Sequence, residues 1–524
     1  MRTKNGYTLK KTIGATAASA ALLLSLAACA TDDAEPVDNA EDASPSTSTE
    51  AEPQTLIAAI GGEPDQLDPH ITSAYFSFQV LENVYDTLVE PDENLAMQPA
   101  LAESWEVSED LLTWTFDLRE DVTFHDGSDF TADDVVYSYK RIIDEALTPS
   151  WRFGSVTDVV AIDDYTVEIQ VSAPTPNLLA AIGGYKGMSI VSQANVESGE
   201  IVSNPVGTGP FKMESYDVAD SIVLSANEDY WGGAPSIDGL EFRFISEGST
   251  ALTALRNGEI HWTDSIPPQN VADLSSESGI NLGQVGSSDY WYLAFNMNRT
   301  PWDDVRVRQA VAYALDREAI TTAALLGNAT VNQTAIPASS DWSSDYAPYS
   351  LDLETAQGLM DEAGVASAEM ELMVSSDYPE TVTAAQVISA QLAEIGINVS
   401  ITTLDFSTWL DGQANGDFDM LMMGWLGNID PDDFYYAQHY STGGFNAQGY
   451  SNAEVDELLD NGRTTADPEA RKGFYDDAAK IIVDEVSYLY LYNPDVVQAW
   501  SDSVQGYVAR GDQAIRFRDA SISE

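Results

Sequence analysis

The chain contains a single cysteine, Cys29, close to its N-terminus. With one cysteine no internal disulfide can form, so the rest of the chain must be held together by buried apolar side chains. About 470 residues follow residue 54, more than one hydrophobic core supports. The sequence therefore predicts a disulfide-free protein of two or more lobes. The cysteine count also argues against a cysteine-ligated zinc site and against thiolate chemistry in the mature fold.

The first 28 residues have the pattern of an export signal. Basic residues at the start precede an uncharged apolar run over 13–28, which is shorter than the roughly 20 residues that span a bilayer. The run ends in the letters LAAC, a sequence that resembles a bacterial lipobox. We therefore expect cleavage before Cys29 and a diacylglycerol on its thiol, which would anchor the protein to a membrane. The alternative is an ordinary secretory signal cut near Ala30.

Acidic and small polar residues dominate the segment after the cysteine. Residues 29–54 are almost all Asp, Glu, Ser, Thr, Pro and Ala, so we expect a disordered tether after the lipidated cysteine. The whole chain has 85 acidic and 23 basic residues, for a formal net charge of −62. This balance argues against nucleic acid or an anionic membrane surface as a partner. The charge is spread evenly, which favours a role in solubility, and attraction of cationic solutes stays open as the alternative.

Strand and helix signals alternate after residue 54. Apolar and polar residues alternate over 114–118 and 167–171, as in half-buried strands. Helical spacing over 307–315 follows Asp303 and Asp304, either of which could cap the helix. A helix over 382–395 ends at Gly396 and precedes a strand over 397–401, and two amphipathic helices are expected over 454–459 and 469–483. This succession predicts an α/β fold.

Catalytic signatures are missing from the sequence. The four histidines lack the spacing of a metal pair, and there is no recognisable serine nucleophile or phosphate loop. Residues 207–212 resemble a phosphate loop only superficially, because Pro210 and the apolar run after it indicate a turn between strands. The acidic pair Asp432 and Asp433 carries little weight in so acidic a chain. We expect no enzyme, no cofactor and no metal, with an extracellular hydrolase as the alternative, since carboxylate sites need no local motif.

Five segments, in order along the chain, resemble family 5 of the bacterial extracellular solute-binding proteins, the dipeptide- and oligopeptide-binding class. The first and most specific runs over 102–138 and includes the letters AESWEV, WTFDLR, VTFHDG and FTADDVVYS. The others lie at 205–231, 292–310, 424–434 and 450–452, and the fourth begins GWLGNIDPDDF. The resemblance covers residues 55 to about 510.

This resemblance implies an α/β, two-lobed fold of the periplasmic-binding-protein type (type II, peptide-binding class), with hinge strands near 292–298 and 488–493. Lobe one would comprise 55–92, 207–297 and 488–524, with an extra subdomain over 93–206, and lobe two would comprise 298–487. Ligand would bind between the lobes, and hinge closure would bury it. His125 and Asp126 then belong to a structural turn, and Arg306 and Arg308 tie a helix to its neighbours.

The implied function is that of a monomeric lipoprotein on the outer face of the cell membrane. It would capture a small solute and deliver it to the permease and ATPase subunits of an ABC importer. The preferred solute is a peptide, and among peptides an oligopeptide. Three alternatives stay open. The solute could be an oligosaccharide, a metal chelate or an opine-like compound, or the chain could be a sensor lipoprotein or a hydrolase.

The expected cleft residues are mainly aromatic, because large flat side chains suit roomy pockets. They are Tyr75, Phe76, Phe78, Tyr290 and Trp291, and in lobe two Phe406, Trp409, Trp425 and Tyr435. Trp425 matches the ligand-facing tryptophan of the family motif.

Two positions depart from the dipeptide binders that this chain resembles. Asn428 stands where those proteins have an aspartate for the ligand's amino group, and Ser375 stands where they have an arginine for its carboxylate. Asp377 or Asp430 could supply a shifted amine anchor. The sequence therefore favours a longer peptide or a non-peptide solute over a free dipeptide.

Overall fold

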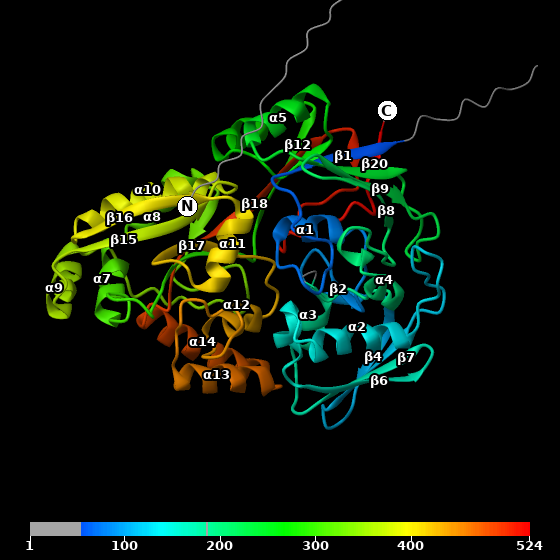
Figure 1. Cartoon of the computed structure of the whole chain (residues 1–524), viewed down its shortest axis with the longest axis horizontal. Helices are drawn as coiled ribbons and strands as arrows, with labels where there is room; N and C mark the ends of the chain where they lie inside the picture. Colours follow the sequence, from blue (N-terminus) through cyan, green and yellow to red (C-terminus); the bar gives the residue numbers. More distant parts are fainter. Residues whose placement is uncertain (1–53, 185–186, 524) are drawn as a thin grey trace, which may run out of the picture. The chain divides into compact units, whose positions relative to one another are not determined.

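The computed structural model describes residues 54–184 and 187–523. The expected signal peptide, the lipidated Cys29 and the tether up to residue 53 lie outside these residues. A 12-stranded mixed sheet runs through the described part in the order β16-β15-β17-β13-β18-β11-β1-β10-β9-β8, with β12 and β14 also paired to β18 (Figure 1).

One long strand, β18 (Tyr488–Ser501), joins the two halves of this sheet. Its first part pairs with β13 (Tyr290–Phe295) and β14 (Ala329–Val331), and its second part pairs with β12 (Ile280–Gly286) and β11 (Trp262–Thr263). The same strand therefore contributes to both lobes.

Lobe one is built on the parallel pair β1 (Thr55–Ile60) and β10 (Gly239–Phe244). Its core contains Leu56, Ile60, Phe242 and Trp262, and the C-terminal segment adds Phe517. The remaining elements are β8 (Phe211–Asp217), β9 (Ser221–Ala226), β19 (Val504–Gln505), β20 (Ser521–Ile522), α1 (Tyr75–Leu81), α4 (Gln193–Ser198), α5 (Gly248–Asn257) and α6 (Val271–Leu274).

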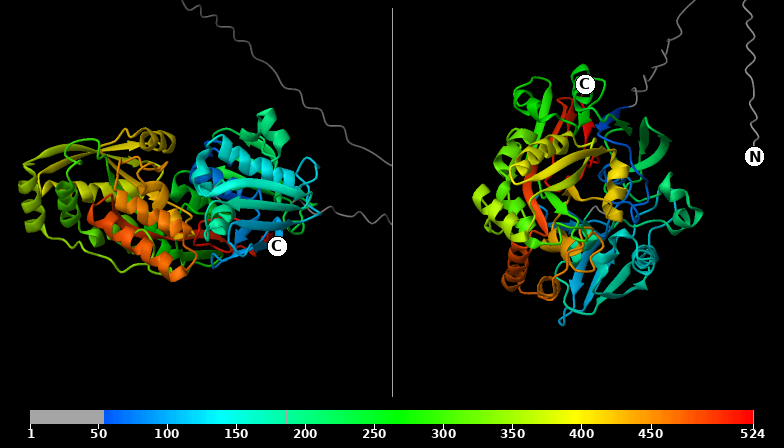
Figure 2. Two further views of the ribbon diagram at one scale, coloured as in Figure 1. Left: turned by 90° about the horizontal axis from the view of Figure 1, so that it is seen from below. Right: turned by 60° about the vertical axis from the view of Figure 1, so that its left-hand side comes forward.

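A separate buried cluster, with Phe116, Tyr139 and Ile169 at its centre, forms the extra subdomain. Helix α2 (Ala132–Asp144) packs against the antiparallel sheet β4-β5-β7-β6, drawn in blue to cyan in Figure 2. The elements are β2 (Val89–Pro91), β3 (Met97–Pro99), β4 (Ala102–Val107), β5 (Thr113–Leu118), β6 (Val156–Asp163), β7 (Thr166–Val171), α3 (Leu178–Gly183) and the 3-10 helix Thr148–Phe153.

Lobe two places helices around β13, β15 (Ala368–Ser375), β16 (Ile397–Leu404) and β17 (Met420–Trp425). β13 runs antiparallel to β17, and β15 runs parallel to both β16 and β17. The helices are α7 (Val305–Ala314), α8 (Arg317–Leu325), α9 (Leu353–Ala363), α10 (Pro379–Ala393), α11 (Phe406–Asn415), α12 (Pro431–His439), α13 (Ala453–Thr464) and α14 (Pro468–Asp484).

The locally predicted elements are confirmed. The alternating segments form β5 and β7, and the carboxylate of Asp304 caps α7 by accepting the Arg306 amide. Gly396 follows α10 with φ of +83°, a conformation that glycine adopts without strain, and β16 begins directly after it. The two expected C-terminal helices are α13 and α14.

The expected lobe boundaries remain a prediction, and the buried clusters favour shifting several of them. All six residues of β13 belong to the same cluster as the core of lobe two, although the sequence placed residues up to 297 in lobe one. Residues 488–492 of β18 belong to that cluster too. In both cases the side chains pack against lobe-two helices, which a local sequence pattern does not show.

Candidate functional site

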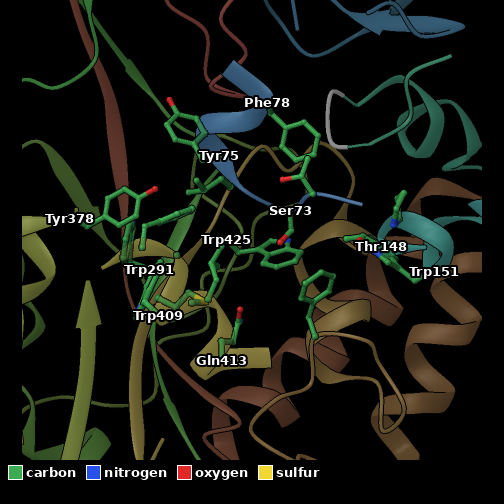
Figure 3. Close-up of a pocket in the computed structure, with 18 of the residues that line it drawn as sticks. Ser73, Tyr75, Phe78, Thr148, Trp151, Trp291, Tyr378, Trp409, Gln413 and Trp425 are labelled. Carbon is green, nitrogen blue, oxygen red and sulfur yellow. The ribbon is translucent and has the colours of Figure 1, made fainter. Parts of the chain in front are cut away.

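A cavity that is partly open to solvent lies between lobe one, the subdomain and lobe two. Figure 3 shows Tyr378, Trp291 and Trp409 on one side of it and Thr148 and Trp151 on the opposite side. The lining residues are Thr72, Ser73, Tyr75, Phe78, Thr148, Pro149, Trp151, Arg152, Trp291, Tyr378, Phe406, Trp409, Leu410, Gln413, Met423, Gly424, Trp425, Leu426 and Phe445.

Helix α11 contributes one face to the cavity. Phe406, Trp409, Leu410 and Gln413 stand at positions i, i+3, i+4 and i+7, which lie on one side of a helix. The carboxylate of Asp405 accepts the Thr408 amide at 3.1 Å and so caps this helix. The cap and the spacing together aim an apolar stripe at the cavity.

The wall formed by β13 and β17 depends on a glycine. Gly424 pairs with Trp291 across the two strands, so both residues face the same side of the sheet. A Cβ at Gly424 would lie 2.8 Å from the Trp291 indole ring. Because glycine has no Cβ, the Trp291 indole can lie against Gly424 beside the cavity.

Tyr378 is the centre of an aromatic cluster at one end of the cavity. Its ring centroid lies 5.4 Å from that of Trp291 and 5.8 Å from that of Trp409. Burial, and then nearby carboxylates, raises the pKa of the Tyr378 hydroxyl well above its usual range. Behind the lining, Asp264 accepts hydrogen bonds from Gln79 at 2.6 Å and Tyr75 at 3.3 Å, and burial raises its pKa to about 6.

At the opposite end, polar contacts connect the subdomain to lobe two. Arg152 Nη1 lies 2.6 Å from an Asp433 carboxylate oxygen, and Arg463 Nη2 donates to the Trp151 carbonyl at 3.0 Å. Asp432 accepts from Arg463 at 2.8 Å and from Asn177 at 3.4 Å. The acidic pair is therefore engaged in ion pairs and hydrogen bonds, an arrangement that does not leave a carboxylate free for acid–base chemistry.

Six of the thirteen predicted cleft residues line the cavity, namely Tyr75, Phe78, Trp291, Phe406, Trp409 and Trp425. Phe76 lies directly behind the lining, with its ring 5.0 Å from Phe406. Trp425 is half-buried, its indole N–H donates to the Asp433 carbonyl at 3.0 Å, and its ring centroid lies 4.7 Å from that of Phe445.

Tyr290 and Tyr435 lie in the core of lobe two and not at the cavity surface. Tyr290 precedes Trp291 on β13, and because successive side chains of a strand point to opposite faces, only one of the pair can face the cavity. The Tyr290 hydroxyl donates to the Phe434 carbonyl at 3.2 Å.

The four polar candidates also lie outside the lining. Asn428 is buried and donates to the carbonyls of Ser288 and Trp425. Asp430 caps α12 and forms a bidentate ion pair with Arg471. Ser375 is fully buried, and Asp377 accepts the Phe406 amide at 2.9 Å. The structure gives each of these side chains a bond within the protein.

The sequence analysis missed most of the remaining lining. Thr148, Pro149, Trp151 and Arg152 come from the 3-10 helix of the subdomain, far in sequence from the residues they face. No local pattern marks them, since their place depends on how the subdomain packs. Tyr378 directly follows the predicted Asp377 in the sequence. Because that position was already a candidate and the predicted aromatic residues of α11 lie beside the tyrosine, Tyr378 could have been included.

The histidines have structural partners. His125 Nε2 lies 2.9 Å from the Gly209 carbonyl, and the Gly207 amide donates to Nδ1, which holds a neutral ring against the turn that precedes β8. Burial lowers the pKa of His125 to about 4. In residues 54–184 and 187–523, no group of three or more His, Cys, Asp or Glu side chains is arranged to hold a metal ion. Nor does this part of the chain contain a helix long and apolar enough to cross a membrane.

A sequence model of the bacterial extracellular solute-binding proteins, family 5 (middle region), matches residues 96–447. The chain belongs to this family. The resemblance inferred from the five segments is thereby confirmed. Among family relatives, the dipeptide-binding protein of Escherichia coli K12 is 29% identical over 508 residues, which cover 90% of this chain and 95% of that protein.

Two solved structures have the same fold. DppA of Helicobacter pylori, in complex with the peptide STSA, matches with a TM-score of 0.84 and 28% identity, over 90% of this chain and 98% of that one. AgaA of A. tumefaciens R10, in complex with agropinic acid, matches with a TM-score of 0.84 and 28% identity, over 90% and 99% of the two chains. The type II two-lobed fold expected for family 5 is confirmed.

Proposed function

We propose that this chain is the substrate-binding component of an ABC importer and that its cavity captures peptides outside the cell for delivery to a membrane permease. Similarity to the dipeptide-binding protein and to peptide-bound DppA supports a peptide ligand. The lining supports it as well, because nine of the 19 described lining residues are aromatic and can cover side chains of different shapes.

The observation that carries the proposal is the part of β17 that lies at the cavity beyond its pairing with β15. β13 pairs with β17 along its whole length, whereas β15 pairs with it only at Met420 and Leu421. Beyond Leu421 no described strand pairs with that edge, and Met423 and Gly424 line the cavity there. An extended peptide can add to such an edge through main-chain hydrogen bonds, while its side chains enter the aromatic pocket.

The burial of Asn428 and Ser375 supports an oligopeptide over a free dipeptide. Neither side chain reaches the cavity, so neither can hold a terminal group of a two-residue ligand. A longer peptide gains main-chain bonds and apolar burial along its length, which makes those two anchors less important.

The test is mass spectrometry of the solute that co-purifies with the protein, followed by calorimetry with the identified compound. We expect peptides of three or more residues. A second candidate is an opine-like solute, favoured by the similarity to AgaA in complex with agropinic acid. Recovery of such a compound, or of an oligosaccharide or metal chelate, as the only bound solute would contradict the peptide proposal.

We further propose that the protein acts as a monomer without catalytic activity, held on the outer face of the membrane by lipid on Cys29. The LAAC sequence after an apolar leader supports the anchor, and the engaged acidic pair supports a binding role over hydrolysis. Incubation of the protein with its co-purified peptide tests the last point. Unchanged peptide mass is expected, and cleavage products that scale with protein concentration would contradict it.

A further inference from the structure

We propose that Arg152 binds the carboxylate of the ligand. This inference rests on the peptide function and names the part of the cavity where the C-terminus of the peptide lies. Arg152 belongs to the 3-10 helix Thr148–Phe153 of the subdomain, which forms the wall opposite Tyr378. It is the one charged residue in the described lining.

The guanidinium of Arg152 has hydrogen-bond donors that bond to no described residue. A guanidinium carries five N–H donors in a planar fork. Among the described residues, the polar contact of Arg152 is the ion pair between Nη1 and Asp433, at 2.6 Å, and its planar group lies 4.7 Å from the Trp151 ring. Arg152 is 8% exposed, and neither Nε nor Nη2 is among the described buried polar atoms that lack a partner, so both donors can meet the solvent of the cavity. A ligand carboxylate would replace water as the acceptor of these donors.

Asp433 fixes the orientation of Arg152. The second carboxylate oxygen of Asp433 accepts the backbone amides of Ile429 at 3.2 Å and Asp430 at 3.1 Å. Because these bonds tie Asp433 to the start of α12, the Arg152 side chain is positioned by a rigid group. One edge of the guanidinium is thus engaged, and the other edge can present two parallel N–H groups, the geometry that matches a carboxylate.

The two other arginines of this cluster have more of their donors engaged. Arg471 donates from Nε to the Gly462 carbonyl and from both terminal nitrogens to Asp430. Arg463 donates from Nε to Asp432 and from Nη2 to both Asp432 and the Trp151 carbonyl. Neither residue lines the cavity. Arg152 alone among the three combines access to the cavity with unused donors.

The experiment compares peptide acids with peptide amides. A pool of tri-, tetra- and pentapeptides with free C-termini, and the same pool amidated, are titrated by calorimetry against the wild type and against Arg152→Gln, Arg152→Lys and Arg463→Gln. Arg463→Gln is the matched control, because it removes an arginine that bridges the same two parts of the protein without lining the cavity. Thermal unfolding of each variant identifies any that fail to fold, and Arg152→Lys then serves in place of Arg152→Gln.

For the wild type, we expect amidation to weaken binding by about 10- to 100-fold, the range of a charge-assisted hydrogen bond. Arg152→Gln should reduce the ratio of acid to amide affinity to about 2-fold or less. Arg152→Lys should give an intermediate ratio, because lysine keeps the positive charge but has no planar pair of N–H donors. Arg463→Gln should leave the ratio unchanged, even where it weakens both pools through poorer closure.

Three results would overturn the assignment while the peptide function stands. The first is equal binding of acids and amides by the wild type, and the second is an acid-to-amide affinity ratio that Arg152→Gln leaves unchanged. The third is a decrease of that ratio in Arg463→Gln as large as the decrease in Arg152→Gln. If the wild type binds neither pool, the peptide function itself fails, and the anchor fails with it.

Discussion

Replacing Trp425 with alanine should weaken ligand binding much more than it weakens the fold. Trp425 stands at the end of β17, lines the cavity and is half-buried. An aromatic side chain of this kind offers on the order of 200 Å² of surface, and one face of it, about 100 Å², is available to a ligand. At about 25 cal/mol per Å², losing that face costs about 2.5 kcal/mol of binding free energy, or roughly 70-fold in affinity.

The matched control is Trp302→Ala in the core of the same lobe. Trp302 is fully buried against Phe295, with 4.7 Å between ring centroids, and does not line the cavity. Its truncation should cost about 3–5 kcal/mol of unfolding free energy and leave affinity unchanged in the folded fraction. The assays are calorimetry with the co-purified solute and denaturant unfolding. If Trp425→Ala loses several kcal/mol of stability and keeps its affinity, the assignment of Trp425 to the ligand site is wrong.

Three further predictions concern pH, ligand length and anchoring. Burial lowers the pKa of His439 to about 3, and its ring nitrogens lie 2.8 Å from the hydroxyls of Ser487 and Tyr490. The neutral ring stabilises the fold fully above pH 6.5, and that stability is lost as pH falls from 6.5 toward 3, because only the unfolded chain takes up the proton. Between pH 6.5 and 4.5 the wild type should therefore lose about 2 kcal/mol more unfolding free energy than His439→Asn, and equal losses in denaturant titrations would refute this. Simple dipeptides should bind weakly, and affinity should show no sharp optimum at a length of two residues, since Asn428 and Ser375 lie outside the cavity lining. Calorimetry that gives a micromolar or tighter dissociation constant for a dipeptide, about −8 kcal/mol, would contradict this. Cys29→Ser should release the protein into the medium, and fractionation that finds the processed variant still on the membrane would rule out the lipid anchor.

The sequence predicted those parts of the fold whose signal is local. The spacing of apolar residues was enough for β5, α7 and α10, because the period of each element is set by its own backbone. The two-lobed architecture could not be worked out from such periods and came from the resemblance to family 5. The place of β13 in the core of lobe two was missed, because it depends on pairing with β17, more than a hundred residues later.

The candidate site was predictable only in part, and for a related reason. Aromatic residues on α11 and β17 were identified because they are conspicuous in the sequence, and the structure brings them to one cavity. Arg152 was missed because residues distant in the chain bring it to the cavity, and nothing in the letters TPSWRF indicates that. Asp430 was read as a possible amine anchor, whereas the structure uses it as a helix cap paired with Arg471. In so acidic a chain, the type of a residue says little about its role.

The passage of β18 through both lobes has a mechanical consequence. Pro494 lies within this strand, where its partners change from β14 to β12. Proline has no backbone N–H, so the ladder has no donor at this residue that bending could break. Its carbonyl accepts from the amide and the hydroxyl of Ser287, a residue of the neighbouring connection that can follow the bend. The strand can therefore bend at Pro494 without losing a ladder donor, and contacts across the cavity such as the Arg152–Asp433 ion pair add to what holds the lobes together.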